Sequence, residues 1–529
     1  ALDLSGNAAL RGSGADVAAL AGACGGLKTL NLYGDAVGAA KVGGGGGPGF
    51  DGLDSLDLSN NKITDDSDLR WMVDAGVGAV RWLDLALNRI SDVPEFTNCS
   101  GLQYLDLSGN LIVGEVPGGA LSDCRGLKVL NLSFNHLAGV FPPDIAGLTS
   151  LNALNLSNNN FSGELPGEAF AKLQQLTALS LSFNHFNGSI PDTVASLPEL
   201  QQLDLSSNTF SGTIPSSLCQ DPNSKLHLLY LQNNYLTGGI PDAVSNCTSL
   251  VSLDLSLNYI NGSIPASLGD LGNLQDLILW QNELEGEIPA SLSRIQGLEH
   301  LILDYNGLTG SIPPELAKCT KLNWISLASN RLSGPIPSWL GKLSYLAILK
   351  LSNNSFSGPI PPELGDCQSL VWLDLNSNQL NGSIPKELAK QSGKMNVGLI
   401  VGRPYVYLRN DELSSECRGK GSLLEFTSIR PDDLSRMPSK KLSNFTRMYV
   451  GSTEYTFNKN GSMIFLDLSY NQLDSAIPGE LGDMFYLMIM NLGHNLLSGT
   501  IPTRLAEAKK LAVLDLTYNQ LRAICQIIS

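Results

Sequence analysis

A phrase of the form L-x-x-L-x-L-x-x-N recurs along almost the whole chain and constrains the fold more than any other feature. Its asparagine recurs every 24 residues between Asn234 and Asn378. Side chains alternate along a strand, so each copy predicts a short strand whose leucines face inward. One copy cannot bury its leucines alone, and the nineteen copies, from Leu2 to Asn519, must therefore stack on one another.

The second half of most repeats reads L-x-G-x-I-P, as at Leu308, Gly310 and Pro313, which matches the plant-specific class of leucine-rich repeat. The sequence therefore predicts an α/β solenoid, a curved plant-type leucine-rich-repeat superhelix with a parallel β-sheet on its concave face. The repeated asparagine amide can bond backbone groups that a tight turn leaves unpaired, and stacked copies would form a ladder.

The regular step fails between Asn378 and Asn471, which lie 93 residues apart. The leucine phrase disappears there, but tyrosine, phenylalanine and leucine remain frequent, so we expect a folded island insert and not a linker. The predicted domains are a solenoid over residues 1–390, the island insert over 391–460 and C-terminal repeats over 461–529. The tail after residue 522 leaves the repeat pattern, so we expect the last part to be truncated, with its cap missing.

Composition argues against several functions. A net charge of -16 and a pI near 4.8 would repel nucleic acid. The five histidines fall in distant repeats, and no C-x-x-C pair suggests zinc, so we expect no catalytic site, cofactor or metal. No apolar run of about eighteen residues occurs, so any attachment to a membrane would need a segment absent from this chain.

Most of the nine cysteines share one place in the repeat, three residues before its first leucine, where the side chain should face the interior. These cysteines are Cys24, Cys99, Cys124, Cys247, Cys319 and Cys367. Equivalent positions in successive coils lie about 4.8 Å apart, so only Cys99 and Cys124 could bridge. We expect buried free thiols in general and assign no role to Cys219, Cys417 or Cys525.

Eleven N-x-S/T sequons predict glycosylation and passage through the secretory pathway. They begin at Asn98, Asn131, Asn155, Asn160, Asn187, Asn246, Asn261, Asn353, Asn381, Asn444 and Asn460. The alternative is that the repeat itself favours N-L-S and N-G-S, with few sites occupied. Asn131 and Asn155 fall within strands on the concave face, where glycans would obstruct a ligand, so we expect ligand to bind elsewhere.

One column of the concave face becomes apolar near the insert. The residue before the second leucine is mostly polar in earlier repeats, at Gln202, Ser252, Asp276 and His300. In the last six repeats it reads Trp324, Ile348, Trp372, Phe465, Ile489 and Val513, which we call the apolar stripe. The stripe is either a seat for the insert or a partly uncovered groove for a small hydrophobic ligand, and both can hold at once.

The insert stretch GRPYVYLRNDELSSEC, the LLEF after it and NGSMIFLDLSYN at its exit closely resemble the brassinosteroid receptor kinases of plants. The specific likeness runs from about Val371 to Leu516. It implies the extracellular side of a plasma-membrane receptor, made in the secretory pathway and passing through endosomes. Such a receptor holds a brassinosteroid between island and concave face. It then recruits a co-receptor kinase of the somatic-embryogenesis type, and its own serine/threonine kinase lies outside this chain.

The resemblance also implies particular hormone contacts. The matching positions are Val371, Trp372, Tyr405, Tyr407, Tyr449, Ile464, Phe465, Met488, Ile489 and Val513. The family pairs the insert cysteine with a second one, but Ser443 stands at that position here, so Cys417 would lack its partner. A peptide-hormone receptor is the alternative, although peptides favour polar columns and the stripe is apolar. A soluble inhibitor of a pathogen enzyme is a third hypothesis, which needs no insert.

Overall fold

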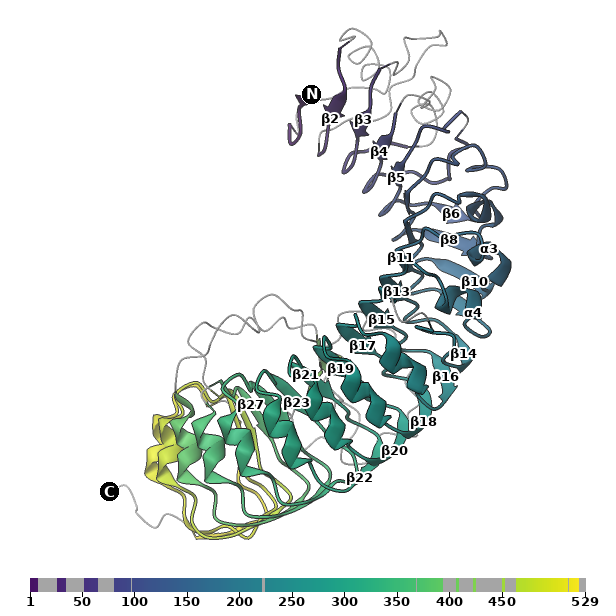
Figure 1. The fold of residues 1–529 in the computed structure, drawn as a ribbon. Coiled ribbons are helices and arrows are strands. Elements are labelled where there is room, and N and C mark those ends of the chain that lie inside the picture. The colour runs from purple at the N-terminus through teal and green to yellow at the C-terminus, as the bar shows by residue number, and fades with distance from the viewer. Residues whose placement is uncertain are drawn as a thin grey trace. The chain divides into compact units, whose positions relative to one another are not determined.

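The structure is a computed structural model that describes residues 1–7, 26–34, 52–64, 80–96, 98–220, 224–367, 369–392, 406–408, 422–424, 450–451, 463–511 and 513–522. The chain forms two compact units (Figure 1). The first unit comprises residues 1–237 and 246–250, and the second comprises residues 238–245 and 251–529. The division falls inside the predicted solenoid, because a stack of repeats has local contacts only and no single central core.

Each leucine phrase forms the predicted strand, and nineteen such strands occur in the described residues. The first unit holds β1 (Leu2–Asp3), β2 (Thr29–Asn31), β3 (Ser55–Asp57), β4 (Trp82–Asp84), β5 (Tyr104–Asp106), β7 (Val129–Asn131), β9 (Ala153–Asn155), β11 (Ala178–Ser180), β13 (Gln202–Asp204) and β15 (Leu228–Tyr230). The second holds β17 (Ser252–Asp254), β19 (Asp276–Ile278), β21 (His300–Ile302), β23 (Trp324–Ser326), β25 (Ile348–Lys350), β27 (Trp372–Asp374), β32 (Phe465–Asp467), β34 (Ile489–Asn491) and β36 (Val513–Asp515). Within each unit the strands of the leucine phrases pair in parallel and in register, which confirms the predicted solenoid.

The second half of each repeat forms short strands and single turns of helix. The strands are β6 (Val113–Gly114), β8 (His136–Gly139), β10 (Asn160–Glu164), β12 (His185–Asn187), β14 (Ser211–Thr213), β16 (Tyr235–Gly238), β18 (Tyr259–Ser263), β20 (Glu283–Glu287), β22 (Gly307–Thr309), β24 (Ser333–Gly334), β26 (Ser355–Gly358), β28 (Gln379–Gly382), β33 (Gln472–Leu473), β35 (Ser498–Thr500) and β37 (Gln520–Arg522). The helices are η3 (Pro143–Gly147), α3 (Gly167–Phe170), α4 (Asp192–Ala195), η4 (Asp242–Asn246), η5 (Ala266–Asp270), η6 (Ala290–Arg294), η7 (Pro314–Lys318), η8 (Ser338–Lys342), η9 (Pro362–Asp366), η10 (Lys386–Ser392), η12 (Gly479–Asp483) and η13 (Thr503–Glu507). In the first unit α3 and α4 lie on the side opposite β11 and β13 (Figure 1).

The core lies between the long sheet and the helices. The three leucines of one phrase, Leu370, Leu373 and Leu375, are buried, so the middle residue of each strand points inward. The first and third residues of each strand therefore form the outer surface of the sheet, the concave face. Helices can stack closely because small residues meet backbone there. A Cβ on Gly365 of η9 would lie 2.1 Å from the carbonyl oxygen of Glu387 in η10.

The repeated asparagines form the predicted ladder. Asn354 donates from Nδ2 to the carbonyl oxygens of Leu327 at 2.9 Å and Leu351 at 3.2 Å, and its Oδ1 accepts from the backbone N–H of Leu332 at 3.0 Å. One amide thus satisfies backbone groups in two coils, groups that would be costly to bury without partners. The same three contacts recur at Asn110, Asn184 and Asn282.

The ladder crosses the island insert without a break. Asn471 Nδ2 donates to the carbonyl oxygen of Leu375 at 3.0 Å, and its Oδ1 accepts from the N–H of Leu380 at 3.0 Å. β27 and β32 pair directly, with Trp372 opposite Phe465. The insert is therefore an excursion from one coil to the next, as the 93-residue step predicts. In the described part of the insert, β29 (Val406–Leu408) pairs antiparallel with β30 (Ser422–Leu424) and β31 (Val450–Gly451).

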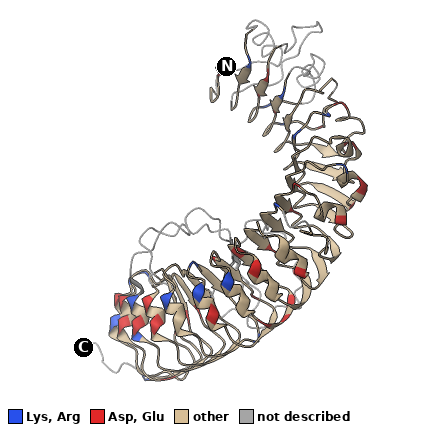
Figure 2. Cartoon of the chain, in the orientation of Figure 1, with Lys and Arg blue, Asp and Glu red and all other residues tan. Residues whose placement is uncertain are grey.

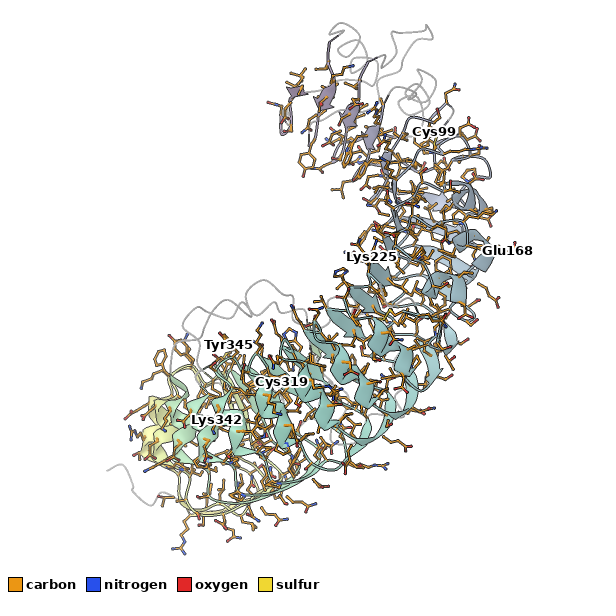
Figure 3. All side chains as sticks on the ribbon, in the orientation of Figure 1. Cys99, Glu168, Lys225, Cys319, Lys342 and Tyr345 are labelled. Carbon is orange, nitrogen blue, oxygen red and sulfur yellow. A yellow bond between two sulfur atoms is a disulfide. The ribbon has the colours of Figure 1, made fainter. Side chains whose placement is uncertain are left out.

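The expectation of free thiols is wrong for Cys99, Cys124 and Cys247, and Cys219, to which the sequence assigned no role, is bridged as well. Cys99 and Cys124 form a disulfide with a Cα separation of 4.6 Å, since they hold the same position in successive coils. Cys219 bridges Cys247 with a Cα separation of 5.2 Å, and no repeat position predicts this pair. Cys319 and Cys367 are buried free thiols, as expected, and Cys319 lies inside the second unit (Figure 3). Cys24, Cys417 and Cys525 lie outside the described residues, as does Ser443.

Replacement of Asn471 by alanine should destabilise the repeats that flank the insert, because it removes the side-chain hydrogen bonds of four buried backbone groups. We expect the free energy of unfolding to fall by about 1 to 3 kcal/mol. Chemical denaturation followed by circular dichroism measures this loss. Gln379→Ala, at an exposed position of β28, is the control and should change little. Equal stability of the two variants would contradict the ladder's structural role.

Non-reducing peptide mapping should recover the Cys99–Cys124 and Cys219–Cys247 links. Cys319 and Cys367 should react with a thiol reagent only after unfolding, because burial hides them and raises the pKa of Cys319 to about 11 and that of Cys367 to about 12. Rapid alkylation of Cys319 in the native protein would show that this interior is open to solvent.

Candidate ligand-binding face

The apolar stripe is continuous across the insert. Its six members occupy the first position of six consecutive strands, β23 to β36, and each lies opposite the next. Trp372 and Phe465 stack with ring centroids 3.8 Å apart and planes 6° from parallel. Trp372 and Phe465 are 93 residues apart in the sequence, but they are neighbours in the stripe because β27 pairs with β32.

The stripe has a closed part and an open part. The closed part is 1 to 2% exposed and consists of Trp324, Ile348, Trp372 and Phe465. Such burial favours the hypothesis that this part of the stripe is a packing surface over the hypothesis that it is an uncovered groove. Ile489 and Val513 are only half-buried. The predicted partly uncovered groove is therefore restricted to the C-terminal end of the stripe.

A second column lies beside this open end. Val371, Ile464 and Met488 each precede the first strand residue in successive coils. The N–H of Ile464 donates to the carbonyl oxygen of Val371 at 2.8 Å, and the N–H of Met488 donates to that of Ile464 at 2.9 Å. Val371 is buried, Ile464 is half-buried and Met488 is 36% exposed. We call Ile464, Met488, Ile489 and Val513 the open patch.

The three predicted tyrosines fall in the insert. Tyr405 and Tyr449 lie outside the described residues. Tyr407 belongs to β29, where its backbone is opposite Leu423 of β30 and Gly451 of β31, and its side chain is outside the described set. The structure therefore brings together the predicted hormone contacts that lie on the repeats. The roles of the three tyrosines stay predictions.

A buried charge cluster lies at the third strand positions next to the stripe, and sequence reasoning missed it. Asp374 and Asp467 are 4% and 5% exposed. Asn491 Nδ2 donates to Asp467 Oδ2 at 2.8 Å, and Ser352 Oγ donates to Asp374 Oδ2 at 3.0 Å. The signal available in the sequence was Lys350, the third residue of β25, which stands between Leu349 and Leu351.

Burial and the neighbouring Asp467 raise the pKa of Asp374 to about 7, although Lys350 opposes this rise. Lys350 Nζ also lies 3.6 Å from Asp304 Oδ1, and both of these side chains are buried. Proton binding to Asp374 at neutral pH therefore relieves repulsion between two carboxylates on adjacent strands.

Charge elsewhere in the second unit gathers on the helices (Figure 2). Lys390 of η10 pairs with Asp366 of η9 at 3.0 Å, and Arg504 of η13 pairs with Asp483 of η12 at 2.7 Å. In the described part of the chain, no group of three histidine, cysteine, aspartate or glutamate side chains could hold a metal. No described helix is long and apolar enough to cross a membrane.

Comparison with known proteins follows the same division into repeats and insert. A family profile described as brassinosteroid receptor island domain matches residues 393–458. Leucine-rich-repeat profiles match residues 51–112, 113–161, 162–210, 224–284, 297–319 and 320–380, more than half of the chain. A brassinosteroid LRR receptor kinase of Oryza sativa subsp. japonica is 99% identical over 490 residues. The chain belongs to the brassinosteroid receptor family of leucine-rich-repeat proteins.

Other relatives agree with this assignment. The rice match covers 93% of this chain and 44% of the rice protein, so the chain spans less than half the length of that relative. A brassinosteroid LRR receptor kinase of Solanum lycopersicum is 56% identical over 101 residues, 19% of this chain and 8% of that protein.

Solved structures of plant receptor ectodomains share the fold. The Arabidopsis receptor kinase HAESA, solved with the peptide hormone IDA and the co-receptor SERK1, aligns with a TM-score of 0.67 and 27% identity over 93% of this chain and 78% of that one. The plant peptide hormone receptor RGFR1, solved with RGF2, aligns with a TM-score of 0.64 and 25% identity over 98% and 86%.

The stability of the second unit should fall as the pH rises from about 4 to about 7. The folded pKa of Asp374 exceeds its ordinary value of 3.8, so the folded state binds the proton more tightly, and this contribution is lost as the pH rises through the folded pKa. Melting temperatures between pH 4 and 8 measure the effect. Asp374→Asn should flatten the profile, and Asp366→Asn, which changes an exposed carboxylate, should not. Identical profiles for both variants would contradict the role of Asp374.

Proposed function

We propose that this chain is the extracellular hormone-binding part of a plant plasma-membrane receptor kinase and that it binds a brassinosteroid. The observation that carries the proposal is the open patch. It lies on the coils directly after the island insert, where Trp372 and Phe465 join the two sides of the insertion. The family match to the island over residues 393–458 supports it.

The open patch suits a rigid, largely apolar ligand. Ile464, Met488, Ile489 and Val513 offer aliphatic side chains on a flat sheet, while the stacked Trp372 and Phe465 hold the adjoining floor in place. A preformed surface of this kind lowers the entropy cost of binding. Hydroxyl groups of the ligand would meet the insert side, where Tyr405, Tyr407 and Tyr449 are the proposed hydrogen-bonding partners.

We further propose that the bound hormone completes a surface for a co-receptor kinase of the somatic-embryogenesis type. The C-terminal repeats expose large apolar side chains, including Phe485 at 47% and Leu496 at 48%. Lys510 Nζ lies 5.0 Å from the ring centre of Tyr486 and 5.9 Å from that of Phe485. Exposed aromatic and aliphatic groups of this kind are typical of protein interfaces.

The full receptor would reach the cell surface through the secretory pathway and pass through endosomes, and its kinase would lie beyond this chain. The nine sequon asparagines among the described residues are exposed or half-buried and need not all carry glycans, and occupancy of each predicted site is a separate proposal. A peptide ligand is less well supported, because the open patch is apolar and extended peptides need polar partners along the sheet.

Titration calorimetry with brassinolide tests the steroid proposal. Ile489→Asp should weaken binding at least about tenfold, because it places a charge on the surface that the ligand would cover. Val129→Asp is the matched control, since Val129 is also a half-buried first residue of a strand but lies in β7. It should bind as tightly as the unmodified protein. Equal affinities for all three proteins would remove the open patch from the hormone site.

A further inference from the structure

One side chain of the open patch can be changed chemically by a mild oxidant. Met488 is 36% exposed, whereas the other three methionines among the described residues, Met463, Met484 and Met490, are 0 to 1% exposed. All four belong to the coils that follow the insert. The described part of the chain therefore presents a single accessible thioether, and that thioether belongs to the proposed hormone surface.

The repeat itself hides the other methionines. Met490 is the middle residue of β34, so its side chain points into the core. Met484 directly follows η12, and Met463 lies two residues before β32. An oxidant reaches these three sulfur atoms only when the coils open.

The exposure of Met488 does not come from a loose backbone. Its N–H donates to the carbonyl oxygen of Ile464 at 2.9 Å, and the N–H of Ile489 donates to the same oxygen at 3.2 Å. Exposure instead rises along the column away from the insert, from buried Val371 through half-buried Ile464 to Met488. The thioether is thus held at the surface in a fixed place.

The cysteines that could compete for an oxidant are shielded. Cys319 and Cys367 are buried free thiols, and the other described cysteines are joined in disulfides. A receptor outside the cell works in an oxidising compartment. A peroxide that meets the described part of the chain should therefore react first at Met488.

We propose that Met488 is a site of reversible oxidation whose sulfoxide weakens hormone binding, an inference that rests on the steroid proposal above. A lone pair of Met488 Sδ attacks one oxygen of hydrogen peroxide. The S–O bond forms as the O–O bond breaks, and the hydroxyl proton on the new S–O group passes to the leaving hydroxide. Sulfur loses two electrons and the peroxide gains them, so the products are methionine sulfoxide and water.

The sulfoxide changes the surface because it replaces a flexible apolar side chain with a polar, hydrated one. A steroid that covered it would remove water from the sulfoxide oxygen, and the side chains of Ile464, Ile489 and Val513 have no donor to replace that water. The N–H groups of Met488 and Ile489 are already bound to the carbonyl oxygen of Ile464. Oxidation should therefore lower the affinity while the coils stay folded.

Peroxide treatment of the whole chain, followed by peptide mass spectrometry, tests the site. We expect Met488 to oxidise at least about tenfold faster than Met463, Met484 and Met490, because reaction follows exposure. Saturating brassinolide should slow oxidation at Met488 and leave the rates at the three buried methionines unchanged. Equal rates at all four residues, or no protection by bound hormone, would overturn the proposal.

Titration calorimetry with brassinolide before and after peroxide tests the consequence. The unmodified protein should lose at least about tenfold in affinity and regain it after treatment with reductases for both sulfoxide epimers. Met490→Leu is the matched control, because it removes a buried thioether from the same strand with little change in volume, and it should stay sensitive. Met488→Leu should have the same affinity before and after peroxide, whatever its starting affinity.

An equal loss of affinity in Met488→Leu would place the sensitive group elsewhere, such as the insert methionines Met395, Met437 and Met448, and would overturn the inference. Full affinity of protein oxidised at Met488 would also overturn it, with the steroid proposal intact. Absence of brassinolide binding before any peroxide would contradict the steroid proposal and the inference together, so the two failures are distinguishable.

Discussion

The solenoid depends on the hydrogen bonds of one repeated side chain, the asparagine that ends each leucine phrase. Asn354 shows the pattern: its half-buried amide donates to the carbonyl oxygens of Leu327 in the preceding coil and Leu351 in its own coil, and it accepts from the N–H of Leu332. The turn at this point leaves backbone groups inside the protein that water cannot reach, and an amide supplies both a donor and an acceptor. The regular spacing of the asparagines follows from this requirement. Leucine burial then stabilises coils that the ladder has already aligned.

The same ladder explains how a large insert can be accommodated. Asn471 binds the carbonyl oxygen of Leu375 as any asparagine binds the preceding coil, although 96 positions separate the two residues. The insert therefore begins and ends on adjacent coils, and Trp372 comes to stack on Phe465. A rigid floor results at the place where the island joins the repeats. This arrangement gives the chain a preformed apolar surface beside a segment that lacks the leucine repeat.

Periodicity predicted the strands, the ladder, the position of the insert and the continuity of the stripe, because each depends on spacing alone. It could not predict the Cys219–Cys247 disulfide, since Cys219 lies at no repeated position. Nor could it show which part of the stripe is open, because exposure depends on what packs above each strand. The burial of Asp374 beside Lys350 escaped for the same reason. The burial of a side chain depends on its neighbours on adjacent strands, and the sequence of a single repeat does not reveal those neighbours.

Hydrogen exchange of the protein with and without brassinolide tests the central claim most directly, because it reports on every strand at once. The account predicts added protection in the segments that carry the open patch, residues 463–467, 488–491 and 513–515, with strands β5 to β13 unchanged. Protection confined to β5 to β13, or none at saturating hormone, would contradict it.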